Sequence, residues 1–208
     1  MKNVLIVTSS AQGDQSVSGH LASTFEGRLR AAHPGVAVVR RDVGTGTIPH
    51  LTHETVAGIR AAPETEAELA TRALSDALVA ELQAADLVVI ASPMYNFGMS
   101  STLKTWFDHV LRAGVTFRYT SAGPEGLLKG KKAVVIESRA GLYSEGPLRH
   151  MDGQEPHIRI LLGFIGIDDV EYVRAERLAF GPDAAEASIE AAAGRLEELA
   201  GGRLPLAA

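Results

Sequence analysis

Residues 86–98 read DLVVIASPMYNFG, and this stretch decides the fold. A short β-branched, apolar run ends at Ser92-Pro93 and passes into a loop that carries aromatic and amide side chains. An amphipathic helix is expected after the loop, because apolar residues recur there at helical spacing. These residues are Leu103, Trp106, Phe107, Val110 and Leu111. A strand, a loop and a helix in this order place a binding loop at the carboxyl edge of a parallel sheet.

The same alternation of strand and helix runs through the rest of the chain. The expected strands are residues 4–7, 36–39, 87–91, 133–137 and 170–173, and the expected long helices are residues 17–32, 64–84 and 183–199. Gly201-Gly202 is expected to stop the last helix, and only the last few residues look loose. Five strands separated by helices predict an α/β fold, a parallel sheet covered by helices on both faces. The pattern does not fix the strand order.

Length and composition restrict the class of protein. The 208 residues fit one domain, residues 1–208, and an apolar share of 46% supports a substantial core. The net charge is −5, without a block of basic residues, which disfavours a nucleic-acid partner. No apolar run is long enough to span a membrane, and the start lacks the pattern of a signal peptide. We therefore expect a cytoplasmic location, with which the absence of cysteine is compatible.

Metal binding is not expected. Of the seven histidines, only His50 and His53 are close in sequence, and no third ligand stands at a familiar spacing from them. We interpret them as solvated loop residues.

The segment after the first expected strand has the character of an anion site. Residues 8–18 read TSSAQGDQSVS and lead into a helix. Hydroxyl groups and the unpaired N–H groups at a helix N-terminus can hold a monophosphate. The segment lacks the G-x-G-x-x-G pattern of dinucleotide sites and the G-x-x-x-x-G-K-[ST] pattern of nucleotide triphosphatases. A simpler alternative is that Ser16 or Ser18 only caps the helix.

Several segments resemble one known family. Met94, Tyr95, Asn96 and Phe97 closely resemble the isoalloxazine-binding loop of the FMN-dependent NAD(P)H:quinone oxidoreductases, also called azoreductases. Residues 137–141, ESRAG, resemble the Ser-Arg-Gly-Gly loop of that family. Residues 113–120, residues 162–167 and Arg41-Asp42 with Ile48-Pro49 also match. The resemblance covers about residues 3–182.

The resemblance implies a flavodoxin-like, doubly wound five-stranded sheet of order 2-1-3-4-5 with FMN as the cofactor. The cofactor-binding residues that it implies are Ser10, Ser16, Val17 and Ser18 at the phosphate, and Met94, Tyr95, Asn96, Phe97, Ser138, Arg139, Ala140 and Gly141 around the isoalloxazine. Asn96 offers both a donor and an acceptor to the pyrimidine edge. The alternative for the aromatic residues, and a fair one for Phe97, is that they plug the end of the core. Ala140 replaces a family glycine, which would cost on the order of 1 kcal/mol if that position needs a positive φ.

The implied activity is hydride transfer from NADH or NADPH to flavin N5 and on to a quinone or an azo compound, with ping-pong kinetics and no covalent nucleophile. The resemblance also implies a homodimer whose two subunits form the active site together. The candidates for positioning the substrate are Tyr119, Arg60, Leu161 and Tyr143. Leu161 and Tyr143 depart from residues found in some relatives, so substrate preference does not transfer, and Arg60 could simply be a solvated helix residue.

Other functions stay open at this point. An electron-carrying flavodoxin would share the fold, but such carriers are usually shorter and lack inserts such as residues 42–63 and 114–130. A reductase that releases free reduced flavin and a biosynthetic quinone reductase are further alternatives. No arginine cluster for a 2′-phosphate is evident, which favours NADH over NADPH.

Overall fold

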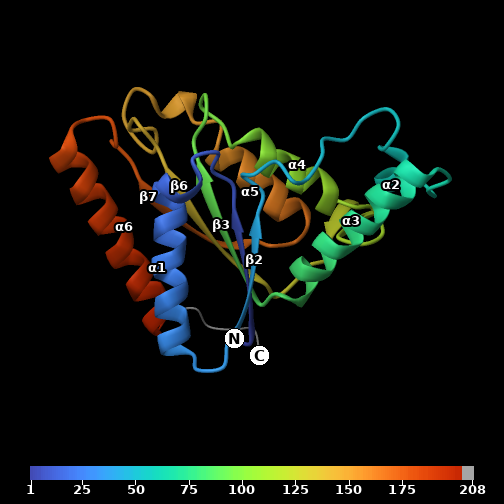
Figure 1. Ribbon diagram of the computed structural model, residues 1–208, viewed down its shortest axis with the longest axis horizontal. Helices are drawn as coiled ribbons and strands as arrows, with labels where there is room; N and C mark the ends of the chain where they lie inside the picture. The colour runs from blue at the N-terminus through green and yellow to red at the C-terminus, as the bar shows by residue number, and fades with distance from the viewer. Residues whose placement is uncertain (203–208) are drawn as a thin grey trace.

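A parallel sheet forms the centre of the computed structural model, which describes residues 1–202 (Figure 1). Its strands are β1 (Asn3–Thr8), β2 (Ala37–Asp42), β3 (Leu87–Pro93), β6 (Lys132–Ser138) and β7 (Asp169–Ala175). They pair in the order β2-β1-β3-β6-β7, and every pairing in this sheet is parallel. Counting only these strands, the order is 2-1-3-4-5, which confirms the expected sheet.

The apolar runs of the sequence become the middle of this sheet. All seven residues of β3 are buried, and all but the first residue of β6 are buried as well. Strands with both faces buried need continuous rather than alternating apolar residues, and this is the pattern of residues 87–91. The edge strand β2 is mostly exposed or half-buried, and it extends to Asp42 rather than ending at residue 39 as expected.

Apolar side chains on alternate positions of the strands enter two separate clusters. Val4 and Ile6 of β1 pack in one cluster with residues of α1 (Val17–Ala32) and α6 (Pro182–Gly202). Leu5 and Val7 pack in the other with residues of α3 (Glu66–Ala84), α4 (Ser101–Val110) and α5 (Glu155–Phe164). Figure 1 shows α1 and α6 side by side on one side of the sheet. Within residues 1–202, no helix has the length and hydropathy needed to cross a bilayer.

The expected stop of the last helix is wrong. Gly201 and Gly202 belong to α6, and neither has the positive φ of a glycine that ends a helix. Since a glycine in the last turn of a helix loses few side-chain contacts, the helix continues through both residues. The last few residues, expected to be loose, lie outside the described residues.

Three smaller elements were not expected. They are the short helix α2 (Ala57–Arg60), the antiparallel hairpin of β4 (Phe117–Thr120) and β5 (Gly123–Gly126), and the helix α5. Strand β5 reads GPEG, which has no β-branched or aromatic residue, so propensity gives no signal for it. The helix α5 does carry a signal, because Ile158 and Leu162 lie one turn apart and are fully buried.

Candidate functional site

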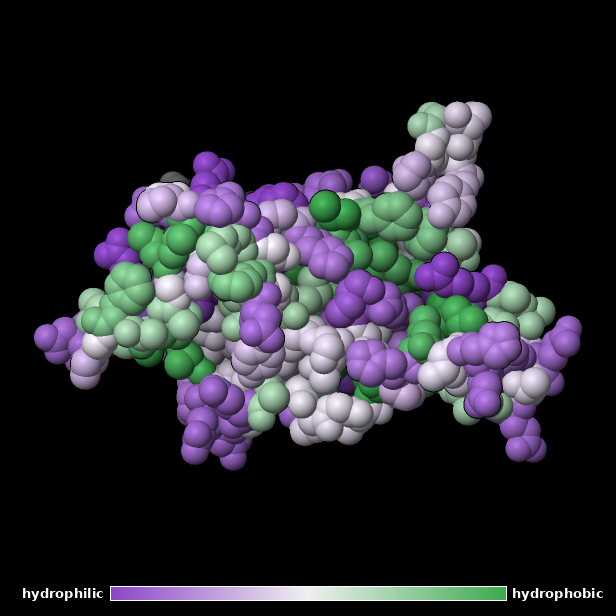
Figure 2. Space-filling view, turned by 90° about the horizontal axis from the view of Figure 1, so that it is seen from above, coloured by the Kyte–Doolittle hydropathy of each residue, from purple (hydrophilic) through white to green (hydrophobic). Residues whose placement is uncertain are grey.

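Three loops follow β1, β3 and β6, and these strands are neighbours in the sheet. The loops therefore meet at the carboxyl edge, which lies at the top in Figure 1 and faces the viewer in Figure 2. Figure 2 shows separate apolar patches among polar groups on this face. Tyr95 links the first two loops, since its hydroxyl accepts from the Ala11 N–H at 3.1 Å and lies 3.3 Å from Ser10 Oγ. The Met94 N–H donates to the Ser138 carbonyl at 2.9 Å and links the second loop to the third.

The first loop ends on the N-terminus of α1. Ser16 caps this helix by accepting from the Gly19 N–H at 3.0 Å, and its Oγ lies 3.2 Å from Ser18 Oγ. Within residues 1–202, the N–H groups of Val17 and Ser18 have no hydrogen-bond acceptor. The first turn also contains no acidic residue. The cap uses one N–H group and leaves two at the positive end of the helix dipole, so capping by Ser16 and binding of an anion are compatible.

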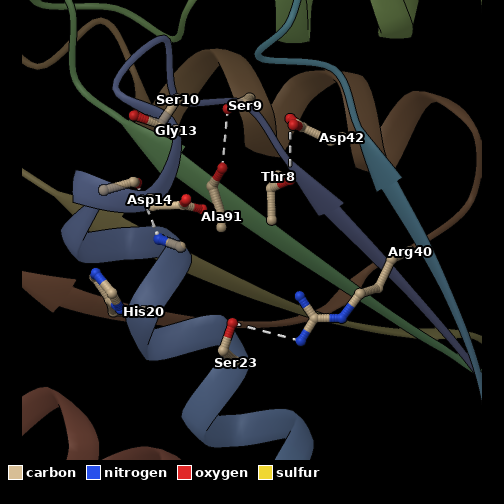
Figure 3. Close-up of a pocket in the computed structure, with 12 residues that line it drawn as sticks. Thr8, Ser9, Ser10, Gly13, Asp14, His20, Ser23, Arg40, Asp42 and Ala91 are labelled. Carbon is tan, nitrogen blue, oxygen red and sulfur yellow. Dashed lines mark hydrogen bonds between the residues drawn. The ribbon is translucent and has the colours of Figure 1, made fainter.

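A polar cavity of about 290 Å³ lies beside this loop, between α1 and β2 (Figure 3). Its walls include His20 and Ser23 of α1 and Arg40 and Asp42 of β2. Asp42 accepts from the Thr8 hydroxyl at 3.2 Å and thereby joins β2 to the end of β1. The cavity places hydroxyl and charged groups next to the free end of α1.

The second loop is a tight, left-handed turn. Asn96 and Phe97 have φ values of 48° and 70°, and the Tyr95 and Gly98 backbones exchange hydrogen bonds across them. Asparagine tolerates this conformation, whereas a phenylalanine adopts it only when its surroundings enforce it. Phe97 is 43% exposed, so it does not plug the core. Its ring stands edge-on to Tyr143, with the ring centroids 5.9 Å apart.

The third loop carries no strain at Ala140. This residue does not have a positive φ, so the condition under which alanine would cost stability is not met. The carbonyls of Arg139, Ala140 and Gly141 accept hydrogen bonds from the backbone of residues 177–179. The N–H groups of Ala140 and Gly141 have no acceptor within residues 1–202, so they are free to bind a ligand.

The Arg139 side chain is not at the surface of the site. It is buried among acidic side chains, where it donates to Glu137 at 2.6 Å and forms ion pairs with Asp152 at 3.0 Å and Glu176 at 3.2 Å. The backbone of Arg139 is occupied as well, since its N–H donates to the Ala175 carbonyl at 2.9 Å and its carbonyl accepts from the Leu178 N–H at 3.2 Å. Sequence reasoning missed this cluster because its members come from separate segments with no motif in common.

Glu176 stabilises the third loop through hydrogen bonds to its backbone. Its carboxylate accepts from the Tyr143 and Ser144 N–H groups at 2.9 and 3.0 Å, and also from the Ser144 hydroxyl. Burial opposes the charge of Glu176, but these hydrogen bonds and Arg139 outweigh it and lower its pKa.

Burial dominates at Glu137, and against the charge of Arg139 it raises the pKa of Glu137 to about 8. One oxygen of Glu137 has no partner in the described part of the chain.

The four candidates for positioning the substrate fall into separate places. Arg60 and Tyr119 line one cavity of about 570 Å³ together with Phe117 and Phe164. Tyr143 packs against Phe97 instead, and Leu161 is a half-buried residue of α5. Tyr119 is 74% exposed, which is high for an aromatic side chain. The structure thus groups Arg60 with Tyr119 and Tyr143 with the second loop.

The histidines do not form a metal site in the described residues, where no group of three or more potential ligands occurs. His50 and His53 are exposed, and His50 Nδ1 lies 2.8 Å from the Thr105 hydroxyl. His109 is fully buried, its Nε2 lies 3.0 Å from the Pro49 carbonyl, and burial lowers its pKa.

Known proteins resemble this chain over almost its whole length. Residues 2–200 match the family model of the flavodoxin-like fold. The FMN-dependent NADH:quinone oxidoreductase of Hyphomonas neptunium is 54% identical over 200 residues, which is 96% of each chain. The enzyme of the same name from Azotobacter vinelandii is 46% identical over 202 residues, which is 96% of this chain and 100% of that one. The crystal structure of an azoreductase from Bacillus anthracis superposes with a TM-score of 0.89 at 32% identity, covering 97% of this chain and 99% of that one.

The chain therefore belongs to the flavodoxin-like fold family and, within it, to the family of FMN-dependent NADH:quinone oxidoreductases. The resemblance inferred from the loop sequences is confirmed.

The raised pKa of Glu137 predicts a pH-dependent contribution to stability. The folded chain holds this proton up to about pH 8, whereas an unfolded glutamate loses it near pH 4.5. Between these values the folded state binds more protons, so the contribution is fully present below the lower value and is lost as the pH rises through the upper one. The variant Glu137→Gln keeps the shape and removes the titration. Relative to that of the wild type, the free energy of unfolding of Glu137→Gln should therefore rise between about pH 5 and 8.

Denaturant titrations at several pH values measure this difference. Taking the difference cancels groups common to both proteins, including His109. The exposed Glu197→Gln variant is the control and should track the wild type. Parallel curves for Glu137→Gln and wild type would contradict the assignment.

Proposed function

We propose that this chain is an FMN-dependent NADH:quinone oxidoreductase that also reduces azo compounds. One observation carries the proposal: three loops from adjacent strands are tied together at the carboxyl edge of a flavodoxin-like sheet, with unpaired N–H groups in the first and the third. The names of the relatives at 54% and 46% identity support the cofactor, the donor and the quinone acceptor. The name of the structural neighbour supports the azo acceptor.

The residues present suit FMN. At the phosphate, the proposed donors are Ser10, Ser16 and Ser18 with the N–H groups of Val17 and Ser18, all neutral groups at the positive end of α1. At the isoalloxazine, the side-chain amide of Asn96 suits the pyrimidine edge, while the N–H groups of Asn96 and Phe97 and those of Ala140 and Gly141, unpaired in the described part of the chain, supply hydrogen bonds. Phe97 offers exposed apolar surface to a planar ring.

Bound FMN would supply an N5 that accepts a hydride from the nicotinamide and passes two electrons to the acceptor. The chain's own contribution is position, because no side chain needs to form a covalent bond. One exposed cofactor face that serves donor and acceptor in turn gives ping-pong kinetics. An azo bond takes two such cycles, each delivering two electrons and two protons.

We further propose that the active site is completed by a second copy of the chain. Arg60 and Tyr119 share one cavity, whereas Phe97 and Tyr143 form a separate contact. A homodimer could bring the first pair over the second and cover exposed residues such as Tyr119 and Ile160, at 74% and 66% exposure. Sedimentation at micromolar concentration should show a dimer, and a 22.0 kDa species alone would contradict this proposal.

The alternative of a flavodoxin-type electron carrier is weaker, because the relatives are named as oxidoreductases of NADH. A single domain and a cytoplasmic location, where NADH is available, complete the proposal.

Anaerobic spectroscopy tests the proposed function. The purified protein, loaded with FMN, should lose its visible flavin bands when NADH is added and regain them when a quinone follows. A protein that binds FMN but ignores both NADH and NADPH would support the carrier instead. Failure to bind FMN would contradict the site itself.

Ser18→Ala tests the phosphate site. Ser18 is fully buried, and within the described residues its hydroxyl has only Ser16 Oγ as a hydrogen-bond partner. Loss of one donor to a charged phosphate should weaken FMN binding by about tenfold. Riboflavin, which has no phosphate, should bind the variant and the wild type equally well.

The control for this test is Ser23→Ala, about one and a half turns further along α1, on the wall of the polar cavity beside the first loop. It should leave both affinities unchanged. Equal losses for FMN and riboflavin in Ser18→Ala would show that Ser18 acts on the fold rather than on the phosphate.

A further inference from the structure

Three consecutive residues hold two of the flavin loops together. They are Asp152, Gly153 and Gln154, between the short helical turn η2 (Arg149–Met151) and α5, and we call them the loop clasp. Asp152 Oδ2 lies 3.0 Å from Arg139 Nη1 in the third loop. The Gly153 N–H donates to the carbonyl of Phe97, in the second loop, at 2.9 Å. The clasp therefore reaches both loops that are proposed to enclose the isoalloxazine.

Gln154 adds hydrogen bonds to Arg139 on one side and to Ser92 on the other, and the orientation of its amide is fixed. Arg139 has only donors, so its Nε, 3.0 Å away, must face the oxygen of the Gln154 amide. The amide nitrogen then points to Ser92, where it donates to the carbonyl at 2.8 Å and to Oγ at 3.0 Å. Gln154 has no exposed surface, so removing the amide would leave Arg139 Nε without a partner and take the side-chain donor away from Ser92 in a dry environment.

The clasp also holds the strained part of the second loop. Phe97 lies in the left-handed region with a φ of 70°, and the Gly153 N–H holds its carbonyl there. The approach is close, since a Cβ on Gly153 would lie 3.0 Å from that carbonyl oxygen. Strained backbone persists only where its surroundings enforce it, and the clasp provides part of that enforcement.

We propose that the loop clasp is a positioning element that sets the spacing of the second and third loops and, through it, the affinity and reduction potential of the bound flavin. The inference rests on the proposed FMN binding. Both loops present backbone groups to the proposed site, and hydrogen bonds to a flavin tune its electronics. A shift of the clasp would change those hydrogen bonds without touching the cofactor.

Gln154→Met tests the clasp, because it keeps the length of the side chain and removes both sets of hydrogen bonds. We expect the FMN dissociation constant to rise by about tenfold or more, with a shift in the midpoint potential of the bound flavin. Gln154→Glu can still accept from Arg139 but loses the donor to Ser92, so its effect should have the same direction. The thermal unfolding midpoint of each apoprotein measures the purely structural cost.

Ser75→Ala is the matched control. Ser75 is also fully buried and makes two hydrogen bonds, to the His109 carbonyl at 2.6 Å and from Arg112 at 3.1 Å, but it joins α3 to α4 and the segment after it. It should lower the unfolding midpoint and leave the FMN affinity and potential unchanged. If Gln154→Met behaves in the same way, the inference is wrong.

A second variant covers the case in which Gln154→Met does not fold. Gly153→Ala keeps every buried side-chain bond and presses its methyl group on the Phe97 carbonyl, so it should also weaken FMN binding and shift the potential. Unchanged values in this folded variant would overturn the inference while the wild type still binds FMN. A wild type that does not bind FMN would overturn the proposed function as well.

Discussion

The site depends on one buried guanidinium. Arg139 has no exposed side-chain surface, and the charges and hydrogen bonds around it come from the end of β6, the segment before α5 and the end of β7. Burying a charged group is costly unless it is paired, so these segments can reach their positions only together. The cluster also fixes the segments next to it, because Glu176 accepts from the N–H groups of residues 143–144 and Gln154 donates to the carbonyl at the end of β3.

Within residues 138–141, the backbone and the Arg139 side chain have separate roles. The resemblance assigned residues 138–141 to the flavin, and the backbone of this loop does leave N–H groups free at the sheet edge. The Arg139 side chain is buried in the cluster and stabilises the loop from inside. Because the cofactor carries the chemistry, the protein needs to hold it rigidly rather than supply a reactive side chain. The buried charges provide that rigidity.

Sequence reasoning went furthest where a single segment carried its own signal. Residues 86–98 predicted β3, the loop and α4 because apolar periodicity and breakers are local properties. The sheet order followed from the resemblance and not from periodicity. Gly201-Gly202 misled the prediction of the end of α6, because neither glycine has a positive φ, and at Ala140 the condition for strain is not met, because its φ is not positive either. The cluster around Arg139 was out of reach, since its partners lie up to 37 residues away and no short pattern joins them.

We propose that three adjacent loops, the third of them fixed by the buried charges around Arg139, bind one flavin. Amide hydrogen exchange with and without FMN tests it most directly. We expect new protection in residues 9–19, 94–98 and 138–144, and little change in the exposed edge strand β2 or in α6. Protection that misses any one of these three loops, or that appears mainly at β2 or α6, would contradict the account.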